Sequence, residues 1–124
     1  MAIFTDELLP DTRMNHNDKL NSTLGAFHLD MQDDGNLVLY TVGMVPLWAS
    51  NTVGNGQFAI MQTDGNLVVY DFAERPVFAS GTHGNPGAFL RCQDDGNLVI
   101  YKEPHPAHAG RAIWATNTHA GPHD

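Results

Sequence analysis

The sequence predicts an all-β fold built from three similar units. A nine-residue stretch occurs three times, at 32–40, 62–70 and 93–101, with a period of about 30 residues. The chain of 124 residues contains 12 Gly and 7 Pro, and no segment shows helical periodicity. A fixed period of this length is typical of repeat proteins, in which no unit can bury its apolar face alone. The three units are therefore expected to close on one shared core within a single domain, residues 1–124.

Each nine-residue copy predicts a β-hairpin with a three-residue loop. If residues 33–35 form the first loop, Met31 pairs with Leu37 and Leu29 with Leu39, so that four apolar side chains share one face. A two-residue loop would mix the faces, because a slip of one residue turns every side chain to the other side of a sheet. The glycine then occupies the left-handed position that closes such loops. The same register gives eight further inward residues: Ala59, Met61, Leu67, Val69, Leu90, Cys92, Leu98 and Ile100.

A shorter repeat follows each hairpin, at 46–52, 76–82 and 112–118, and predicts another strand with one large aromatic residue. Aromatic side chains bury the most area per residue. We therefore expect these three at the centre of the shared core: Trp48, Phe78 and Trp114.

Residues 3–24 are the least regular part of the chain. Ile3-Phe4 and Leu20 to Leu24 are expected to form short strands that complete the first sheet. Asp6 to Asp18 are expected to form turns, because Pro10 and the polar run 15–18 favour loops.

The motif Q-x-D-x-N-x-V-x-Y occurs in three copies, followed in turn by W-A-S-N-T, F-A-S-G-T and W-A-T-N-T. This pattern closely resembles the monocot (snowdrop-type) mannose-binding lectin family, the bulb-type lectin domain. The resemblance spans residues 20–121. It implies a β-prism of three antiparallel four-stranded sheets around a pseudo-threefold axis, with one sugar site per sheet. It also implies homodimers made by exchange of the last strand, here about 112–118.

The resemblance implies that each site binds mannose through Gln, Asp, Asn and Tyr, with Val as the apolar contact. In the family, Asp and Asn hold the axial 2-hydroxyl, Gln the 3-hydroxyl and Tyr the 4-hydroxyl. Independently of the family, a carboxylate, two amides and a phenol suit sugar hydroxyls, each of which both donates and accepts. The expected carbohydrate-binding residues are Gln32, Asp34, Asn36, Val38 and Tyr40, then Gln62, Asp64, Asn66, Val68 and Tyr70, then Gln93, Asp95, Asn97, Val99 and Tyr101.

This chain departs from the family in two respects. Several members have a disulfide between the positions of Gly35 and Gln57, where this chain has no cysteine. The outward residues beside the motifs also differ between the three copies, so the three sites are expected to be unequal. Alternatively, the pair beside the second motif belongs to an interface. The pairs are His28 and Asp30, Phe58 and Ile60, and Phe89 and Arg91.

Charge and composition restrict the partners. The net charge of −8 argues against nucleic acid and anionic membrane surfaces, and no stretch is apolar enough for membrane insertion. Residues 1–19 do not resemble a signal peptide, and the single Cys92 is expected to be a buried thiol that forms no internal disulfide. These features fit either a cytoplasmic protein or a secreted one without a visible leader.

Metal and catalytic interpretations are weaker. The loop 102–110 is Pro-rich and lies beside the third motif, where it either extends or covers that site. The histidines in and after it lack a ligand spacing, so a solvated loop is preferred to a metal site: His105, His108, His119 and His123. The acidic pairs at 33–34 and 94–95 are turn residues, and no nucleophile has an adjacent base.

The sequence therefore predicts a metal-independent, non-enzymatic lectin without a cofactor. It would recognise mannose-rich glycans through up to three sites and multivalent avidity. The alternative is a β-prism protein-interaction module whose sugar sites are vestigial.

Overall fold

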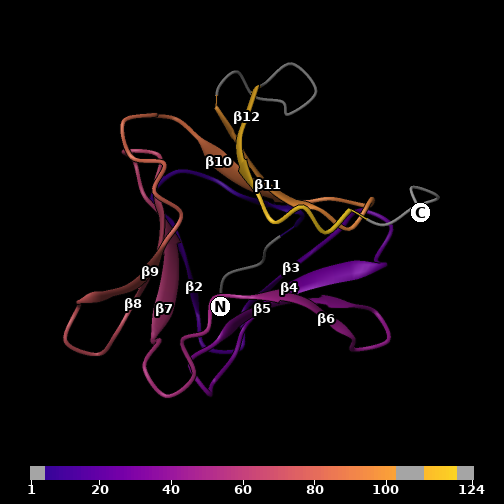
Figure 1. Ribbon diagram of the computed structural model, residues 1–124, viewed down its shortest axis with the longest axis horizontal. Helices are drawn as coiled ribbons and strands as arrows, with labels where there is room; N and C mark the ends of the chain where they lie inside the picture. Colours follow the sequence, from indigo (N-terminus) through magenta and orange to yellow (C-terminus); the bar gives the residue numbers. More distant parts are fainter. Residues whose placement is uncertain (1–4, 103–110, 120–124) are drawn as a thin grey trace.

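The computed structural model describes residues 5–102 and 111–119, which contain twelve β-strands and no helix. The strands form three antiparallel sheets of four strands each, arranged around a common axis as a β-prism (Figure 1). The all-β fold of three units predicted from the repeats is thus confirmed, as is the β-prism that the resemblance implied.

Each sheet consists of one early strand, one motif hairpin and one strand from the shorter repeat. The first sheet has the order β3 (Lys19–Asn21), β4 (Phe27–Met31), β5 (Leu37–Thr41) and β6 (Pro46–Ala49). The second has β2 (Thr12–Asn15), β7 (Phe58–Met61), β8 (Leu67–Tyr70) and β9 (Pro76–Ala79). The third has β1 (Glu7–Leu8), β10 (Phe89–Cys92), β11 (Leu98–Lys102) and β12 (Arg111–Ala115).

The N-terminal segment gives one strand to each sheet, which corrects the expectation of turns from Asp6 to Asp18. That range contains β1 and β2, while the strand expected from Leu20 to Leu24 is β3 and ends at Asn21. Strands of two to four residues are too short for an alternating pattern to be recognised. The signal that identifies them is one apolar residue every six positions, since Leu8, Met14 and Leu20 are all fully buried. Ile3-Phe4 lie outside the described residues.

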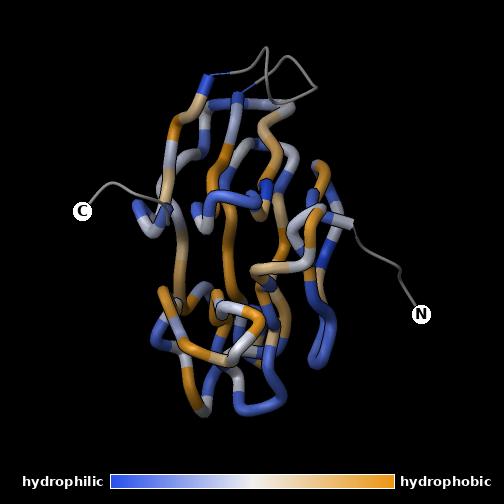
Figure 2. Tube along the Cα trace, turned by 90° about the vertical axis from the view of Figure 1, so that its right-hand side faces the viewer, coloured by the Kyte–Doolittle hydropathy of each residue, from blue (hydrophilic) through white to orange (hydrophobic). Residues whose placement is uncertain are grey.

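The predicted hairpin register is confirmed in all three motifs. In the first, Met31 pairs with Leu37 and Leu29 with Leu39, and the turn is closed by Gln32 N donating to Asn36 O at 2.9 Å. The loop glycine has φ of +95°, a conformation that costs a residue with a Cβ about 1–2 kcal/mol. All twelve predicted inward side chains are at most 1% exposed. Figure 2 shows hydrophobic stretches along the strands in the middle of the molecule, with hydrophilic residues at many turns.

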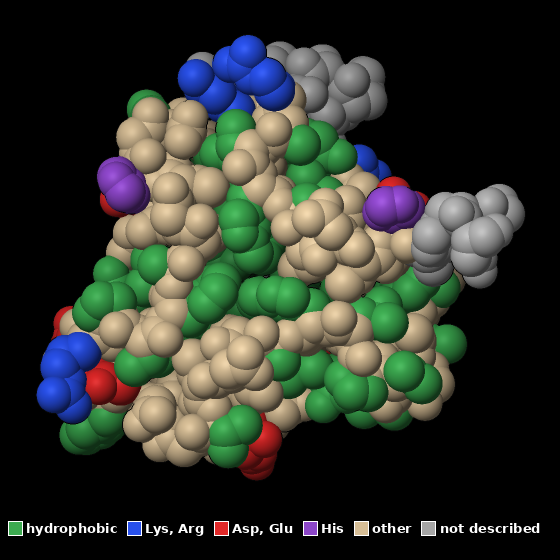
Figure 3. All heavy atoms as spheres, viewed as in Figure 1, with side chains coloured by type: hydrophobic (Ala, Val, Ile, Leu, Met, Phe, Trp, Pro, Cys, Tyr) green, Lys and Arg blue, Asp and Glu red, His purple; other side chains and the backbone are tan. Residues whose placement is uncertain are grey.

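The three aromatic residues of the shorter repeats meet each other, but not at the centre of the core. The rings of Trp48, Phe78 and Trp114 pack edge to face, with centroids 5.5 to 6.4 Å apart. They are only partly buried and pack against a core whose centre is filled by Leu, Met, Val, Ala and Ile side chains. Figure 3 shows hydrophobic side chains gathered in the middle of one face of the prism.

Cys92 is a buried structural thiol, as the sequence predicted. Burial, and then the nearby carboxylates of Asp6 and Asp94, raise its pKa to about 12. The thiolate is the reactive form, so this thiol is inert at neutral pH. Over the part of the chain that the structure describes, no helix could cross a membrane.

A close backbone approach between Gly35 and Gly56 lies beside the positions, Gly35 and Gln57, where the resemblance implies a disulfide in several family members. Residues 52–57 pack against the first motif turn, where Gly54 N donates to Asp34 O at 2.7 Å and Thr52 Oγ1 donates to Gly35 O at 2.6 Å. A Cβ on Gly56 would lie 2.1 Å from Gly35 O. The contact therefore depends on the absence of a side chain at Gly56.

We predict that Gly56→Ala destabilises the protein by about 1–3 kcal/mol, because the added methyl group forces the loop away from the turn. Gly43→Ala is the matched control, since its methyl group would lie 3.8 Å from Thr41 Oγ1 and neither glycine has a positive φ. Urea unfolding of both variants measures the difference. Equal free energies of unfolding for the two variants would contradict this account of the contact.

Candidate functional site

The four polar residues of the first motif converge on the outer face of the β4–β5 hairpin. The Tyr40 hydroxyl donates to Oε1 of Gln32. Nε2 of Gln32 donates to both carboxylate oxygens of Asp34, at 3.1 Å each. Asp34 is exposed, while the other three are partly buried. The chain thus presents a connected polar surface of the composition that the sequence predicted.

Asn36 is oriented by one hydrogen bond within its own motif and two from the shorter repeat that follows it. Its backbone N donates to Oδ1 of Asp34 at 2.9 Å. Its side-chain Oδ1 accepts from Ser50 Oγ at 3.2 Å and from Thr52 N at 3.1 Å. Because Oδ1 is engaged, Nδ2 is the part of the amide that remains to donate to a ligand. An acceptor, Asp34, and a donor, Asn36, are therefore held beside each other.

The shorter repeat therefore supports the site as well as the core, which sequence reasoning missed. In the second and third copies, the first hydroxyl residue again donates through its Oγ, and the second through its backbone N, to Oδ1 of the motif Asn. The signal for this role is a Ser or Thr at both positions in all three copies. The pairs are Ser50 and Thr52, Ser80 and Thr82, and Thr116 and Thr118.

The third site repeats the first, and the second differs. Tyr101 donates to Oε1 of Gln93, whose Nε2 donates to Asp95 at 3.2 and 3.3 Å. In the second site Nε2 of Gln62 donates instead to the Tyr70 hydroxyl. The Asp64 carboxylate accepts from the backbone N of Asn66 at 3.0 Å, as in the other motifs, but no hydrogen bond from Gln62 to Asp64 is found among the described residues. This difference is consistent with the expected inequality of the sites.

The three motif valines lie almost completely buried beneath the polar residues. Their exposed fractions are 3%, 2% and 3% for Val38, Val68 and Val99. Each faces the outer side of its sheet, as predicted, and each leaves only a small apolar surface for a ligand.

A ring stands behind each motif tyrosine, a second feature that sequence reasoning missed. His28 stacks on Tyr40 with centroids 5.5 Å apart. Phe58 and Phe89 lie in the same way against the tyrosines of the second and third motifs, at 5.4 and 5.9 Å. The signal was present as a ring residue four positions before each Gln. These contacts restrict the tyrosine rings, and thereby position their hydroxyl groups.

The described part of the chain contains no group of three or more His, Cys, Asp or Glu residues that could hold a metal ion. Three of the four histidines considered for a metal site, His105, His108 and His123, lie outside the described residues, as does most of the loop 102–110.

We predict that Ser50→Ala lowers the free energy of unfolding by about 1–3 kcal/mol, because a buried donor loses its acceptor. Leu37 N donates to Ser50 Oγ at 3.0 Å in the buried part of the sheet. Thr23→Ala, at an exposed hydroxyl, is the control and is expected to change stability by less than about 0.5 kcal/mol. Thermal unfolding that fails to separate the two variants would show that this hydrogen bond is not needed.

No family model matches the chain. Among solved structures, the lectin of Marasmius oreades aligns with a TM-score of 0.83 and 31% identity, covering 95% of this chain and 97% of that one. Monomeric monocot mannose-binding lectins from Gastrodia elata align with a TM-score of 0.79 and 34% identity, over 93% and 99% of the two chains. The mannose-specific agglutinin of snowdrop (Galanthus nivalis), complexed with methyl-α-D-mannoside, has a TM-score of 0.72 and 41% identity, over 94% and 99%.

Two curated relatives are much longer than this chain. They are G-type lectin S-receptor-like serine/threonine-protein kinases of Oryza sativa, subspecies indica and japonica, 44% identical over 43% of this chain. The chain spans only 8% of the length of these curated relatives.

Proposed function

The chain belongs to the monocot mannose-binding, bulb-type lectin family, and on this premise we propose that it binds mannose, without a metal, at up to three sites. It is a non-enzymatic carbohydrate-binding protein, like its structural neighbours. The observation that carries the proposal is the convergence of Gln, Asp, Asn and Tyr on the outer face of each hairpin. The sites proposed are the three sets of five motif residues.

The pairing of acceptor and donor suits the axial 2-hydroxyl of mannose. A hydroxyl group both donates and accepts, so it can donate to Asp34 while accepting from Nδ2 of Asn36. Glucose has an equatorial 2-hydroxyl and would leave both groups poorly satisfied, at a cost of ~1–3 kcal/mol. Gln32 and Tyr40 would then take the 3- and 4-hydroxyls.

The internal hydrogen bonds of the site favour binding because they reduce the cost of ordering it. Asp34 is held by the backbone of Asn36 and by Gln32, and Asn36 by Ser50 and Thr52. Groups fixed before the ligand arrives lose less entropy on binding.

We propose multivalency as the mechanism of tight binding. A shallow, exposed site buries little area and is expected to bind one mannose with a dissociation constant of ~mM. The three sheets face different directions around the axis (Figure 1), so they suit clustered glycans rather than one short chain. Simultaneous engagement of several sites would raise avidity by ~10²–10⁴.

Methyl α-mannoside is predicted to perturb the backbone amide signals of the three motifs in an NMR titration. The triple variant Asp34→Ala, Asp64→Ala, Asp95→Ala should stay folded and lose these shifts, because the carboxylates face solvent. Asp33→Ala, an exposed carboxylate in the first turn, is the control and should keep them.

Methyl α-glucoside serves as the control sugar in the same titration. An absence of shifts with the mannoside up to ~100 mM, well above the expected dissociation constant, would mean that the sites are vestigial. The protein-interaction module would then be the better interpretation.

Homodimers formed by exchange of the last strand remain part of the proposal. In the described chain β12 pairs with β11 of the same chain, and a partner's β12 could occupy the same place. Trp114 would then pack against the partner's Trp48 and Phe78.

Light scattering is expected to give twice the mass of one chain. A chain that ends at Gly110 lacks β12, and it should unfold or become monomeric because the third sheet loses its outer strand. A truncated chain that stays folded with unchanged mass in solution would reject the exchange.

A further inference from the structure

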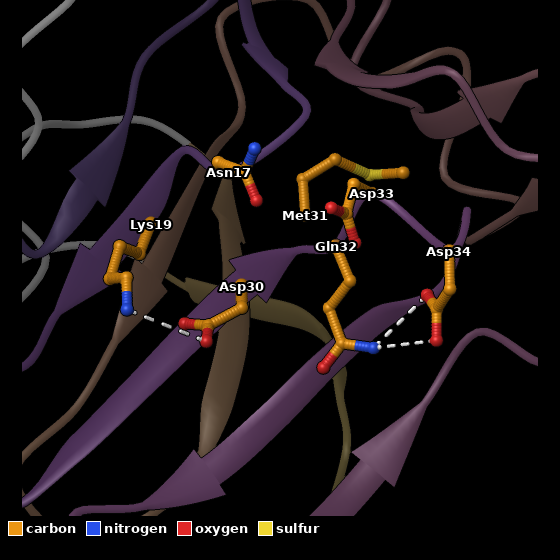
Figure 4. A pocket seen from close by; sticks show the side chains of 7 residues that line it. All are labelled: Asn17, Lys19, Asp30, Met31, Gln32, Asp33 and Asp34. Atoms are coloured by element: carbon orange, nitrogen blue, oxygen red, sulfur yellow. Dashed lines mark hydrogen bonds and ion pairs between the residues drawn. The ribbon is translucent and has the colours of Figure 1, made fainter.

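A pocket of about 370 Å³ opens directly beside the first site. Gln32 and Asp34 of the sugar-binding set form one side of it, and Lys19 and Asp30 form the other (Figure 4). Asn17 and Asp33 also line it. The pocket therefore continues the first site across β4 towards β3, beyond the residues assigned to the first mannose.

The side of the pocket opposite Gln32 and Asp34 is formed by two residues that pair across neighbouring strands of the first sheet. Lys19 on β3 pairs in register with Asp30 on β4, and Lys19 Nζ lies 3.7 Å from Oδ2 of Asp30. Nδ1 of His28 lies 2.6 Å from the other oxygen, Oδ1. The carboxylate is thus fixed from two sides, while Lys19 stays half exposed and can turn towards a ligand.

The equivalent positions on the other two sheets carry different chemistry. On the second sheet Arg13 pairs with Ile60, and its guanidinium lies over the Phe58 ring, 3.9 Å from the centroid. On the third sheet the paired residues are Glu7 and Arg91, so the acidic and basic positions are exchanged relative to the first sheet. Arg91 there is also bound to Asp6, with Nε 3.0 Å from Oδ2. Beside the first site, by contrast, the ammonium group of Lys19, the carboxylate of Asp30 and the amide of Asn17 line one pocket.

These groups suit a neutral sugar. Lys19 offers donors, Asp30 and Asp33 offer acceptors, and Asn17 offers both, which matches the neighbouring hydroxyls of a hexose. Three carboxylates, those of Asp30, Asp33 and Asp34, line the pocket with one ammonium, so an acidic sugar would be repelled.

We propose that the first site recognises a disaccharide, with a terminal mannose on the motif residues and a second neutral hexose in the pocket of Asn17, Lys19 and Asp30. This inference rests on the proposed function, because it takes the first mannose as bound at Gln32, Asp34, Asn36 and Tyr40. It makes the first site different in specificity from the other two.

The test is an NMR titration of the full chain with methyl α-mannoside and with α1-2, α1-3 and α1-6 mannobiose. At least one mannobiose is expected to bind the first motif ~5–10-fold more tightly than the monosaccharide, as one or two added hydrogen bonds would give. Its shifts should include the amides of Lys19 and Asp30. At the second and third motifs the affinities should agree within about twofold.

Two variants test whether the pocket causes this preference. Lys19→Ala and Asp33→Ala, both at exposed positions, are expected to reduce the mannobiose advantage at the first motif to below about twofold. Neither should change the affinity for methyl α-mannoside. Arg13→Ala, at the equivalent position of the second sheet, is the matched control and should leave the advantage intact.

Equal affinity of the first motif for methyl α-mannoside and every mannobiose would overturn the disaccharide site while leaving the lectin function in place. An advantage that survives in both pocket variants would also overturn it. Failure of all these sugars to shift any motif would overturn the proposed function together with this inference.

Discussion

The register of the three motif hairpins is the constraint on which the rest of the structure depends. Side chains alternate across a strand, so a shift of one residue would turn the apolar set outward and the polar set inward. The three-residue turn closed by Gly35 prevents this shift, and the same turn occurs in the other two hairpins. One local conformation thereby builds the core and presents the polar residues of the sites.

The last strand of each sheet, such as β6, also links the core to the site. On the inner side Trp48 packs against the core, and two residues later Ser50 binds Asn36. The strand that completes the sheet therefore also orients the amide proposed to donate to the sugar. This coupling explains why the shorter repeat keeps both an aromatic residue and two hydroxyl residues. It also means that loss of β12 would affect the third site as well as the third sheet.

Sequence patterns predicted the hairpins, their faces and the convergence of the motif residues, because each depends on short-range alternation and on one turn. They failed at the N-terminus, where β1 and β2 each contribute only one buried residue. They also predicted Trp48 at the centre of the core, whereas it is partly buried and packs against the core. Periodicity shows which residues face inward but not how deeply each is buried. The pocket beside the first site was not foreseen, because Lys19 and Asp30 meet only through the pairing of β3 with β4.

A crystal structure of the protein with methyl α-mannoside tests the central claim most directly. The account predicts sugar on the outer face of the hairpins, with its 2-hydroxyl between Asp34 and Nδ2 of Asn36 and its 4-hydroxyl at Tyr40. Continuous density at the first motif in this orientation would establish the site at atomic level. Sugar bound elsewhere, with the first motif empty at saturating concentration, would contradict the assignment of the motif residues.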